Sequence, residues 1–223
     1  MTMEDGNYTM WNNWAKKRFG MSVFDNWLDK YENLLEEHED GRMLDLGCGN
    51  GADTRYLLER DYNVISCDFA DNALENVKRF VKNSSIKKVD MTKELPFEDG
   101  SFGVVVADLS LHYFDFKTTK KIIAEIQRVL NSRGVLFARV VSSGNYQNPV
   151  KEIGYEIEKN YYWEGEYAKR LFNKEDVEKF FGVFSNLQYE ENEMTRDDEE
   201  YRNPRKVFAL RGFFYAIKRK VLS

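Results

Sequence analysis

The stretch MLDLGCGNGAD, residues 43–53, decides how this chain folds. It joins an apolar run to three glycines at alternate positions, Gly47, Gly49 and Gly51. Glycine lacks a β-carbon and adopts positive backbone angles, so such a loop lets the main chain approach a ligand closely. A plain strand-to-helix turn requires fewer glycines. The stretch therefore predicts a buried strand that ends in a ligand-binding loop.

Apolar runs alternate with amphipathic segments along the rest of the chain. Strands are expected at residues 42–47, 62–68, 87–91, 102–110 and 134–141, and helices at 52–61, 72–82 and 118–130. Continuous Val, Ile and Leu runs are typical of parallel strands covered on both faces. The pattern predicts a doubly wound, Rossmann-like α/β sheet with helices on both faces. Ligands of such sheets bind beyond the carboxyl ends of the strands, where the glycine loop lies.

The composition excludes several classes of protein. The chain has 223 residues, 42% of them hydrophobic, with a net charge of −5, which fits one globular domain and argues against sequence-independent nucleic-acid binding. No apolar run reaches the ~18 residues of a membrane span, and no signal peptide is visible. Cys48 and Cys67 are too few for a disulfide framework or a structural zinc site. We expect a cytoplasmic protein without metal, membrane or nucleic-acid partner, of undetermined oligomeric state.

The ligand of the glycine loop has two interpretations. Gly47, Gly49 and Ala52 fit the G-x-G-x-x-A pattern of dinucleotide-binding loops, and Asp68 follows at a distance suited to a ribose. That pattern would fit a nicotinamide-dependent oxidoreductase. Asp45 argues for a different ligand, because a carboxylate beside a pyrophosphate is an electrostatic cost. A ligand that carries an ammonium group would be favoured there instead.

Two motifs resemble those of the class I S-adenosylmethionine-dependent methyltransferases. They are LDLGCGNG, residues 44–51, and LPFEDGSFGVVVADLSLHYF, residues 95–114, and the similarity covers roughly residues 42–141. One departure is Gly103, where the family usually has an acid. The resemblance implies a seven-stranded, mostly parallel sheet whose last strand is antiparallel, and residues 185–195 and 206–218 suit the last two strands.

The resemblance also implies a site for S-adenosylmethionine and its product S-adenosylhomocysteine. Its residues would be Asp45, Gly47, Cys48, Gly49, Gly51, Asp68, Phe69, Asp90, Met91, Asp108 and Leu109. The loop would lie under the methionine and ribose portions, and Asp68 would accept hydrogen bonds from the ribose hydroxyls. Phe69, Asp90 and Met91 would meet the adenine. The plainer interpretations are a strand-end turn residue for Asp90 and a core methionine for Met91.

The chemistry requires little of the protein, because holding an activated methyl in line with its acceptor can supply ~7–11 kcal/mol of the barrier. A general base matters only where the acceptor must lose a proton. His112 and Tyr113 are the candidates, and a structural role for either is an equal alternative. His38, in a charged segment, is expected in solvent.

Substrate choice is expected to come from segments outside the shared core. We expect an N-terminal helical cap at residues 1–40, the cofactor-binding core at 41–141, a substrate-cap insertion at 142–172, and a helix with the last two strands at 173–223, all in one domain. The aromatic residues predicted to form a lid, or else to anchor these segments, are Tyr8, Trp11, Trp14 and Trp163. Arg18, Arg139 and Arg170 would bind a substrate carboxylate or, more simply, lie at the surface.

The sequence thus predicts a methyltransferase that acts on a small-molecule acceptor. The alternatives are a nicotinamide-dependent oxidoreductase and a non-catalytic module that binds S-adenosylmethionine.

Overall fold

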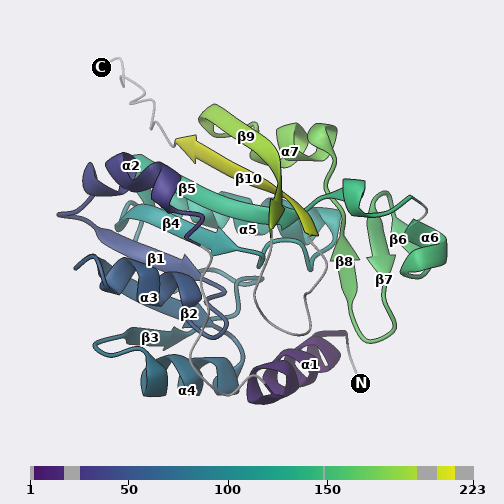
Figure 1. Cartoon of the computed structure of the whole chain (residues 1–223), viewed down its shortest axis with the longest axis horizontal. Coiled ribbons are helices and arrows are strands. Elements are labelled where there is room, and N and C mark those ends of the chain that lie inside the picture. Colours follow the sequence, from purple (N-terminus) through teal and green to yellow (C-terminus); the bar gives the residue numbers. More distant parts are fainter. Residues whose placement is uncertain (1–2, 18–25, 148, 195–204, 214–223) are drawn as a thin grey trace, which may run out of the picture.

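The computed structural model describes residues 3–17, 26–147, 149–194 and 205–213. Its body is a seven-stranded sheet in the order β3-β2-β1-β4-β5-β10-β9 (Figure 1). The strands are β1 (Arg42–Leu46), β2 (Asn63–Asp68), β3 (Ser85–Lys88), β4 (Phe102–Asp108), β5 (Leu130–Val141), β9 (Ser185–Met194) and β10 (Arg205–Phe213). Strands β1 to β5 pair in parallel, whereas β10 is antiparallel to both β5 and β9. The predicted topology is confirmed. Residues 214–218, expected in the last strand, lie outside the described residues.

Alternate residues of the central strands face two separate cores. Met43 and Val104 belong to one apolar cluster, while their neighbours Leu44 and Val105 belong to the other. The first face is covered by η1 (Asp29–Tyr31), α2 (Glu32–Glu36) and α3 (Ala52–Leu58), and the second by α5 (Phe116–Val129) and α7 (Lys174–Phe181). Burial on both faces explains why these strands are apolar at nearly every position.

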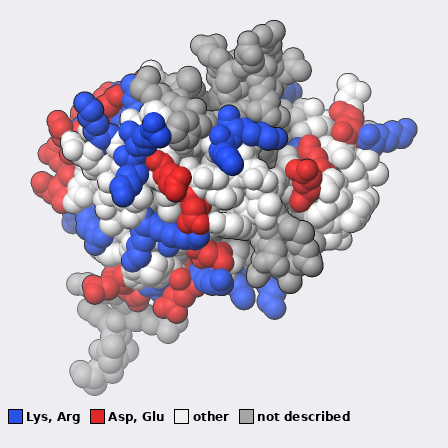
Figure 2. Space-filling model, turned by 90° about the horizontal axis from the view of Figure 1, so that it is seen from below, with Lys and Arg blue, Asp and Glu red and all other residues white. Residues whose placement is uncertain are grey.

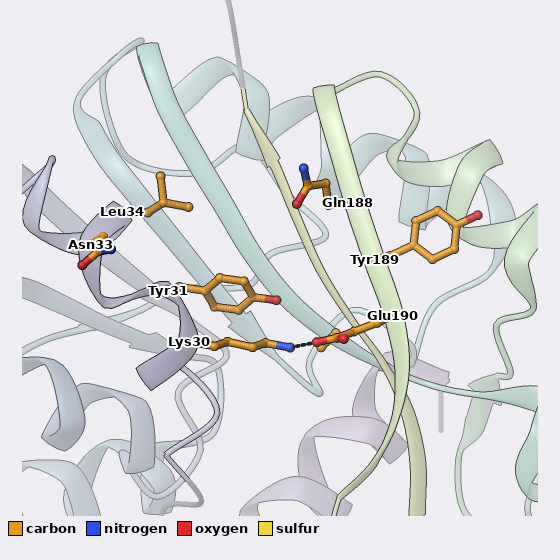
Figure 3. Close-up of a pocket in the computed structure, with 8 residues that line it drawn as sticks. Lys30, Tyr31, Asn33, Leu34, Gln188, Tyr189 and Glu190 are labelled. Atoms are coloured by element: carbon orange, nitrogen blue, oxygen red, sulfur yellow. Dashed lines mark hydrogen bonds and ion pairs between the residues drawn. The ribbon is translucent and has the colours of Figure 1, made fainter.

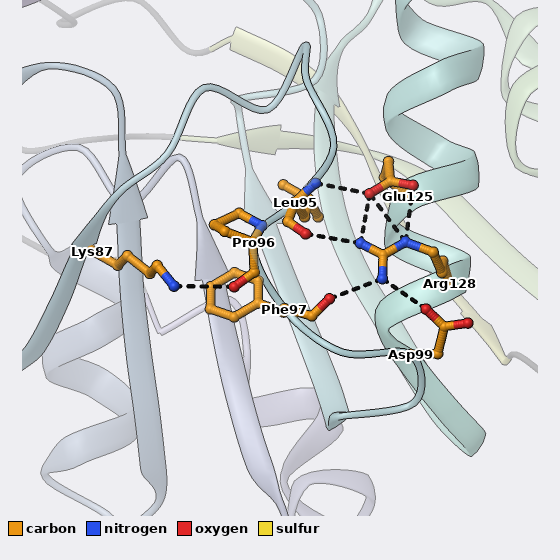
Figure 4. Close-up of polar contacts among 7 residues, drawn as sticks. All are labelled: Lys87, Leu95, Pro96, Phe97, Asp99, Glu125 and Arg128. Atoms are coloured by element: carbon orange, nitrogen blue, oxygen red, sulfur yellow. Dashed lines mark hydrogen bonds and ion pairs between the residues drawn. The ribbon is translucent and has the colours of Figure 1, made fainter.

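Arg128, on α5, holds the segment that leads into β4 (Figure 4). Its guanidinium donates hydrogen bonds to the carbonyl oxygens of Leu95 at 2.9 Å and Phe97 at 2.8 Å. It also pairs with the carboxylates of Asp99 at 2.8 Å and Glu125 at 2.7 Å. One side chain therefore satisfies several polar groups of a segment that has no regular structure.

Two appendages lie at the end of the sheet toward which the parallel strands point (Figure 1). The first is α1 (Met3–Lys17), which packs against α4 (Asp71–Phe80). The second follows β5 and contains η2 (Ser143–Asn145), α6 (Pro149–Glu152) and a small sheet of β6 (Glu156–Glu158), β7 (Tyr161–Trp163) and β8 (Ala168–Arg170). Both appendages are thus placed beside the carboxyl edge of the large sheet.

Side-chain hydrogen bonds fix α1 on α4. The Tyr8 hydroxyl donates to Asp71 at 2.6 Å, and the Asn72 side chain donates to the Asn12 carbonyl at 2.9 Å. Asn76 donates in the same way to the Ala15 carbonyl at 2.9 Å. Tyr8 therefore anchors the helix.

Within the described parts of the chain, every helix is too short or too polar to cross a bilayer.

Candidate active site

The three glycines of the loop after β1 have positive φ angles, but they serve different purposes. A β-carbon on Gly47 would lie 2.4 Å from the Ser110 β-carbon, and one on Gly51 would lie 2.9 Å from a Val77 methyl. A β-carbon on Gly49 would meet nothing within 4 Å. Gly47 and Gly51 are therefore required for close packing inside the protein. Gly49, at φ +51°, faces open space that a ligand can fill.

Asp68 lies beside this space, at the end of β2. Its Oδ2 accepts a hydrogen bond from the Gly49 amide at 3.0 Å, and its Oδ1 accepts one from the Ala70 amide at 2.9 Å. Burial raises the pKa of Asp68, and these backbone donors oppose that shift. The two carboxylate oxygens together have about four acceptor sites, so the carboxylate keeps capacity for a ligand's donor beside these backbone amides. The arrangement suits two neighbouring hydroxyl groups.

Asp45, by contrast, is turned toward α3. It is only 1% exposed, and the Thr54 hydroxyl donates to its Oδ2 at 2.6 Å. Burial raises the pKa of Asp45 to about 7, with the nearby Asp108 carboxylate adding to the shift. The predicted contact of Asp45 with a ligand's amino-acid end stays a prediction, and it requires backbone or water as an intermediary.

A buried group of charged residues, which the sequence did not predict, lies next to Asp45. The Arg139 guanidinium pairs with both carboxylate oxygens of Asp108, at 2.6 and 2.8 Å, and lies 4.7 Å from the Trp27 ring centroid. The Trp27 indole donates to Asp53 at 2.8 Å. Burial makes the largest contribution to the raised pKa of Asp53, and the nearby Asp108 and Asp45 carboxylates add to it. The Asp108 carboxylate is therefore paired with a cation of the protein itself, the Arg139 guanidinium.

Two arginines expected at the surface are buried. Arg139 is 4% exposed and Arg170 is 2% exposed. Arg170 pairs with Glu158 and donates to the Lys159 carbonyl at 3.1 Å. The expectation of surface placement is wrong for both residues, because the fold supplies each with an acidic partner, Asp108 for Arg139 and the partly exposed Glu158 for Arg170. Arg18 lies outside the described residues.

Leu109, directly after β4, has φ +50°. A bulky residue rarely adopts this angle, and such strain costs about 1–3 kcal/mol. Its amide donates to the Arg139 carbonyl at 3.0 Å, and its side chain packs against Val141, Tyr162 and Leu171. These contacts hold the strained backbone at the carboxyl edge, where functional strain commonly collects.

The residues expected around an adenine differ in which parts of the protein they contact. Phe69 lies 6.0 Å from the Tyr8 ring, edge to face, beneath α1. Asp90 accepts hydrogen bonds from the Thr92 amide at 3.0 Å and hydroxyl at 2.6 Å, so it also serves as the turn residue of the plainer interpretation. Met91 packs against the larger core, and Cys48 packs against Leu74, Val77 and Val81. The Cys48 side chain is therefore directed into the core.

An aromatic cluster joins three separate segments at this edge. Trp11 of α1 lies 4.5 Å from Tyr113 and 6.3 Å from Tyr167, and the two tyrosines are 5.9 Å apart between ring centroids. Trp14 packs against Trp11 at 5.6 Å. The insertion reaches Trp11 through Tyr167, which the sequence did not single out, whereas the predicted Trp163 lies on β7. His112, 2% exposed, has its ring 4.1 Å from that of Tyr113.

A separate surface groove of about 470 Å³ lies between the η1–α2 segment and strands β9 and β10 (Figure 3). Lys30 spans it to reach Glu190, and Tyr31 and Gln188 also line it. Neither the glycine loop nor Asp68 contributes to this groove.

Comparisons with known proteins give similarity in sequence and in fold. Residues 44–138 match the sequence model of a methyltransferase domain. An uncharacterized chloroplastic methyltransferase of Arabidopsis thaliana is 33% identical over 132 residues, which are 54% of this chain and 37% of that relative's length.

Two solved structures share the fold. A structure of an S-adenosylmethionine-dependent methyltransferase from Anabaena variabilis matches 96% of both chains with TM-score 0.64 and 16% identity. Burkholderia thailandensis 1,6-didemethyltoxoflavin-N1-methyltransferase, with bound 1,6-didemethyltoxoflavin and S-adenosylhomocysteine, matches with TM-score 0.57 and 17% identity. That match covers 82% of this chain and 76% of the other. At these identities the two structures inform the fold alone.

Proposed function

We propose that the chain is a class I S-adenosylmethionine-dependent methyltransferase that transfers a methyl group to a small-molecule acceptor, because residues 44–138 match the sequence model of a methyltransferase domain. The observation that carries this proposal is the pairing of Gly49 with Asp68. Gly49 faces open space, and its amide holds the Asp68 carboxylate at the edge of that space. A backbone without side chains beside a two-oxygen acceptor fits a nucleoside with its ribose hydroxyls.

The described residues around this space fit S-adenosylmethionine. Asp68 would hold the ribose, the Gly49 backbone would lie along the chain between ribose and methionine, and Phe69 under Tyr8 would cover the adenine. Asp108 and Leu109, at the end of β4, would bound the sulfonium end. When bound, the cofactor would supply an activated methyl group; the acceptor would attack its carbon opposite the sulfur, with S-adenosylhomocysteine as the leaving group.

The acceptor side is proposed to be closed by the cluster of Trp11, Tyr113 and Tyr167. Aromatic walls suit a small organic acceptor and exclude water from the reacting atoms. His112 and Tyr113 are the residues proposed to remove an acceptor proton where one must leave. On the face seen in Figure 2, basic and acidic side chains are interspersed, which favours a small molecule over a polyanion.

The lid is tested by hydrogen exchange in the full chain. If α1 closes over bound ligand, S-adenosylhomocysteine should slow exchange of the amides of residues 8–17, by about tenfold or more. The α5 amides, on the second face of the sheet, serve as an internal control. Equal exchange of residues 8–17 with and without ligand would mean that Trp11 and Trp14 are anchors only.

The cofactor itself is tested by calorimetric titration of the intact protein with S-adenosylmethionine, S-adenosylhomocysteine and NADH. We expect binding of the first two and none of NADH. Binding of NADH alone would favour the oxidoreductase alternative. Tight S-adenosylmethionine binding without any methylated product would favour the non-catalytic module.

A further inference from the structure

Lys169, on β8, is a buried cation in the insertion. It is 5% exposed, its ammonium lies 2.6 Å from Glu164 Oε2, and it donates to the Tyr146 hydroxyl oxygen at 3.1 Å. Lysine is almost never fully buried unless it is paired. Removing two charges from water costs free energy that their attraction often fails to recover, so an apolar pair would stabilise this position equally well. A buried lysine here therefore calls for an explanation other than stability.

Lys169 lies at the carboxyl edge of the large sheet. Tyr146 directly follows η2, which itself follows β5. Tyr146 and Leu109 pack against the same apolar cluster of Val141, Tyr162 and Leu171. Since Leu109 directly follows β4, Lys169 and Tyr146 lie on the side proposed for the acceptor.

The partner of Lys169 belongs to the turn that closes the aromatic cluster. Glu164 and Tyr167 lie between β7 and β8, and the Glu164 amide donates to the Tyr167 carbonyl at 2.8 Å. Tyr167 contacts Trp11 and Tyr113. Gly165, between them, has φ +87°, and a β-carbon there would meet nothing within 4 Å. The ion pair of Lys169 therefore positions the same turn that carries the Tyr167 ring.

The two members of the ion pair differ in accessibility. The Lys169 side chain is 6% exposed, whereas that of Glu164 is 30% exposed and sits on a turn. Lys169 is thus the fixed partner, and Glu164, whose side chain is partly exposed although its Oε2 atom is buried, is the exchangeable one. Among the described residues, Lys169 contacts Tyr146 and Glu164, which leaves one of its three N–H groups for another acceptor atom.

We propose that Lys169 and Tyr146 bind a carboxylate group of the acceptor, and that Glu164 occupies this place until the acceptor arrives. The inference rests on the proposed function and narrows the acceptor to small molecules that carry a carboxylate. An acceptor carboxylate in the place of Glu164 keeps the buried Lys169 ammonium neutralised, so the turn that carries Tyr167 stays ordered against Trp11. Recognition of the acid is in this way coupled to closure of the aromatic cluster.

The test is chemical rescue of the intact chain. Glu164→Ala removes the internal carboxylate, and exchange of the amides at residues 164–168 should become about tenfold faster. Acetate at about 50 mM, above the mM affinity expected of one charge-assisted pair, should restore protection, whereas chloride at equal ionic strength should not. Glu166→Ala, an exposed acid on the same turn, is the matched control and should neither loosen the turn nor respond to acetate.

Acetate should have no effect on the double variant Glu164→Ala/Lys169→Met. Rescue that persists in the double variant, or no rescue of Glu164→Ala, would overturn the carboxylate site. Titration of each variant with S-adenosylmethionine separates this inference from the proposed function. Normal cofactor binding without acetate rescue contradicts the carboxylate site alone, and rescue without cofactor binding contradicts the proposed function alone.

Discussion

Replacement of Asp68 by alanine tests the proposed ribose contact. In the protein, Oδ1 and Oδ2 are each positioned by one backbone amide, from Ala70 at 2.9 Å and Gly49 at 3.0 Å. A hydrogen bond to a charged acceptor contributes about 1.5–3 kcal/mol, and water in the space left by the side chain recovers part of two such bonds. We expect Asp68→Ala to weaken S-adenosylmethionine binding by about 2 kcal/mol, or about thirtyfold, in calorimetric titration.

The same substitution leaves the Gly49 and Ala70 amides without their acceptor, so a loss of stability must be separated from a loss of binding. Urea unfolding in the absence of ligand measures that loss, which we expect to be about 1–2 kcal/mol. Asp61→Ala, an acid in the turn after α3, is a control that should leave binding unchanged. Unchanged S-adenosylmethionine affinity in a folded Asp68→Ala protein would refute the ribose contact.

Three further substitutions test the glycine loop, the buried Asp45 carboxyl group and the contacts of Arg128. Gly49→Val should abolish S-adenosylmethionine binding in titration, while Gly100→Val, also at positive φ but against ordinary contacts, should affect stability only. For Asp45, burial raises the folded pKa from 3.8 to about 7, so the native state binds a proton that the unfolded state releases, and stability falls as pH rises between these values. The free energy of unfolding, measured with urea at about pH 5 and pH 8, should fall less between these pH values in Asp45→Asn than in the unsubstituted chain. An equal fall in both proteins would contradict the raised pKa of Asp45. Arg128→Met should destabilise the fold by about 2–3 kcal/mol without changing cofactor affinity, whereas exposed Arg133→Met should do neither.

The sheet was predictable because strands that are buried on both faces are apolar at nearly every position. Val104 and Val105 face different cores, so both must be apolar, and the run from residue 102 to residue 108 predicts its own strand. Asp68 was predictable for a related reason, since it stands where the second strand ends. Its role as a ribose acceptor stays a prediction.

The buried charges were not predictable, because their partners are distant in sequence. Arg139 pairs with Asp108 across 31 residues, and Trp27 bonds to Asp53 across 26. Asp53 belongs to the glycine-rich stretch of residues 43–53, yet nothing near it in sequence indicates a buried partner. Only the parallel pairing of β4 with β5, which places Asp108 opposite Arg139, brings the ion pair together.

Local geometry explains two other places where the structure differs from the sequence prediction. Tyr167 contacts Trp11 from the turn between β7 and β8, whereas the predicted Trp163 lies on β7 itself. His38 was expected in solvent but is half-buried beside Gly103, where its Nδ1 lies 3.2 Å from the place of a β-carbon. The missing side chain at Gly103, noted only as a departure from the family, makes room for the His38 ring.

The proposed function is transfer of a methyl group from S-adenosylmethionine to a small acceptor. The most direct measurement is mass spectrometry of S-adenosylhomocysteine formed from S-adenosylmethionine over a library of small metabolites that includes acids and their matching amides. We expect acceptor-dependent product that is lost in Gly49→Val. S-adenosylhomocysteine at the background level with every acceptor, from a protein that binds S-adenosylmethionine, would contradict it.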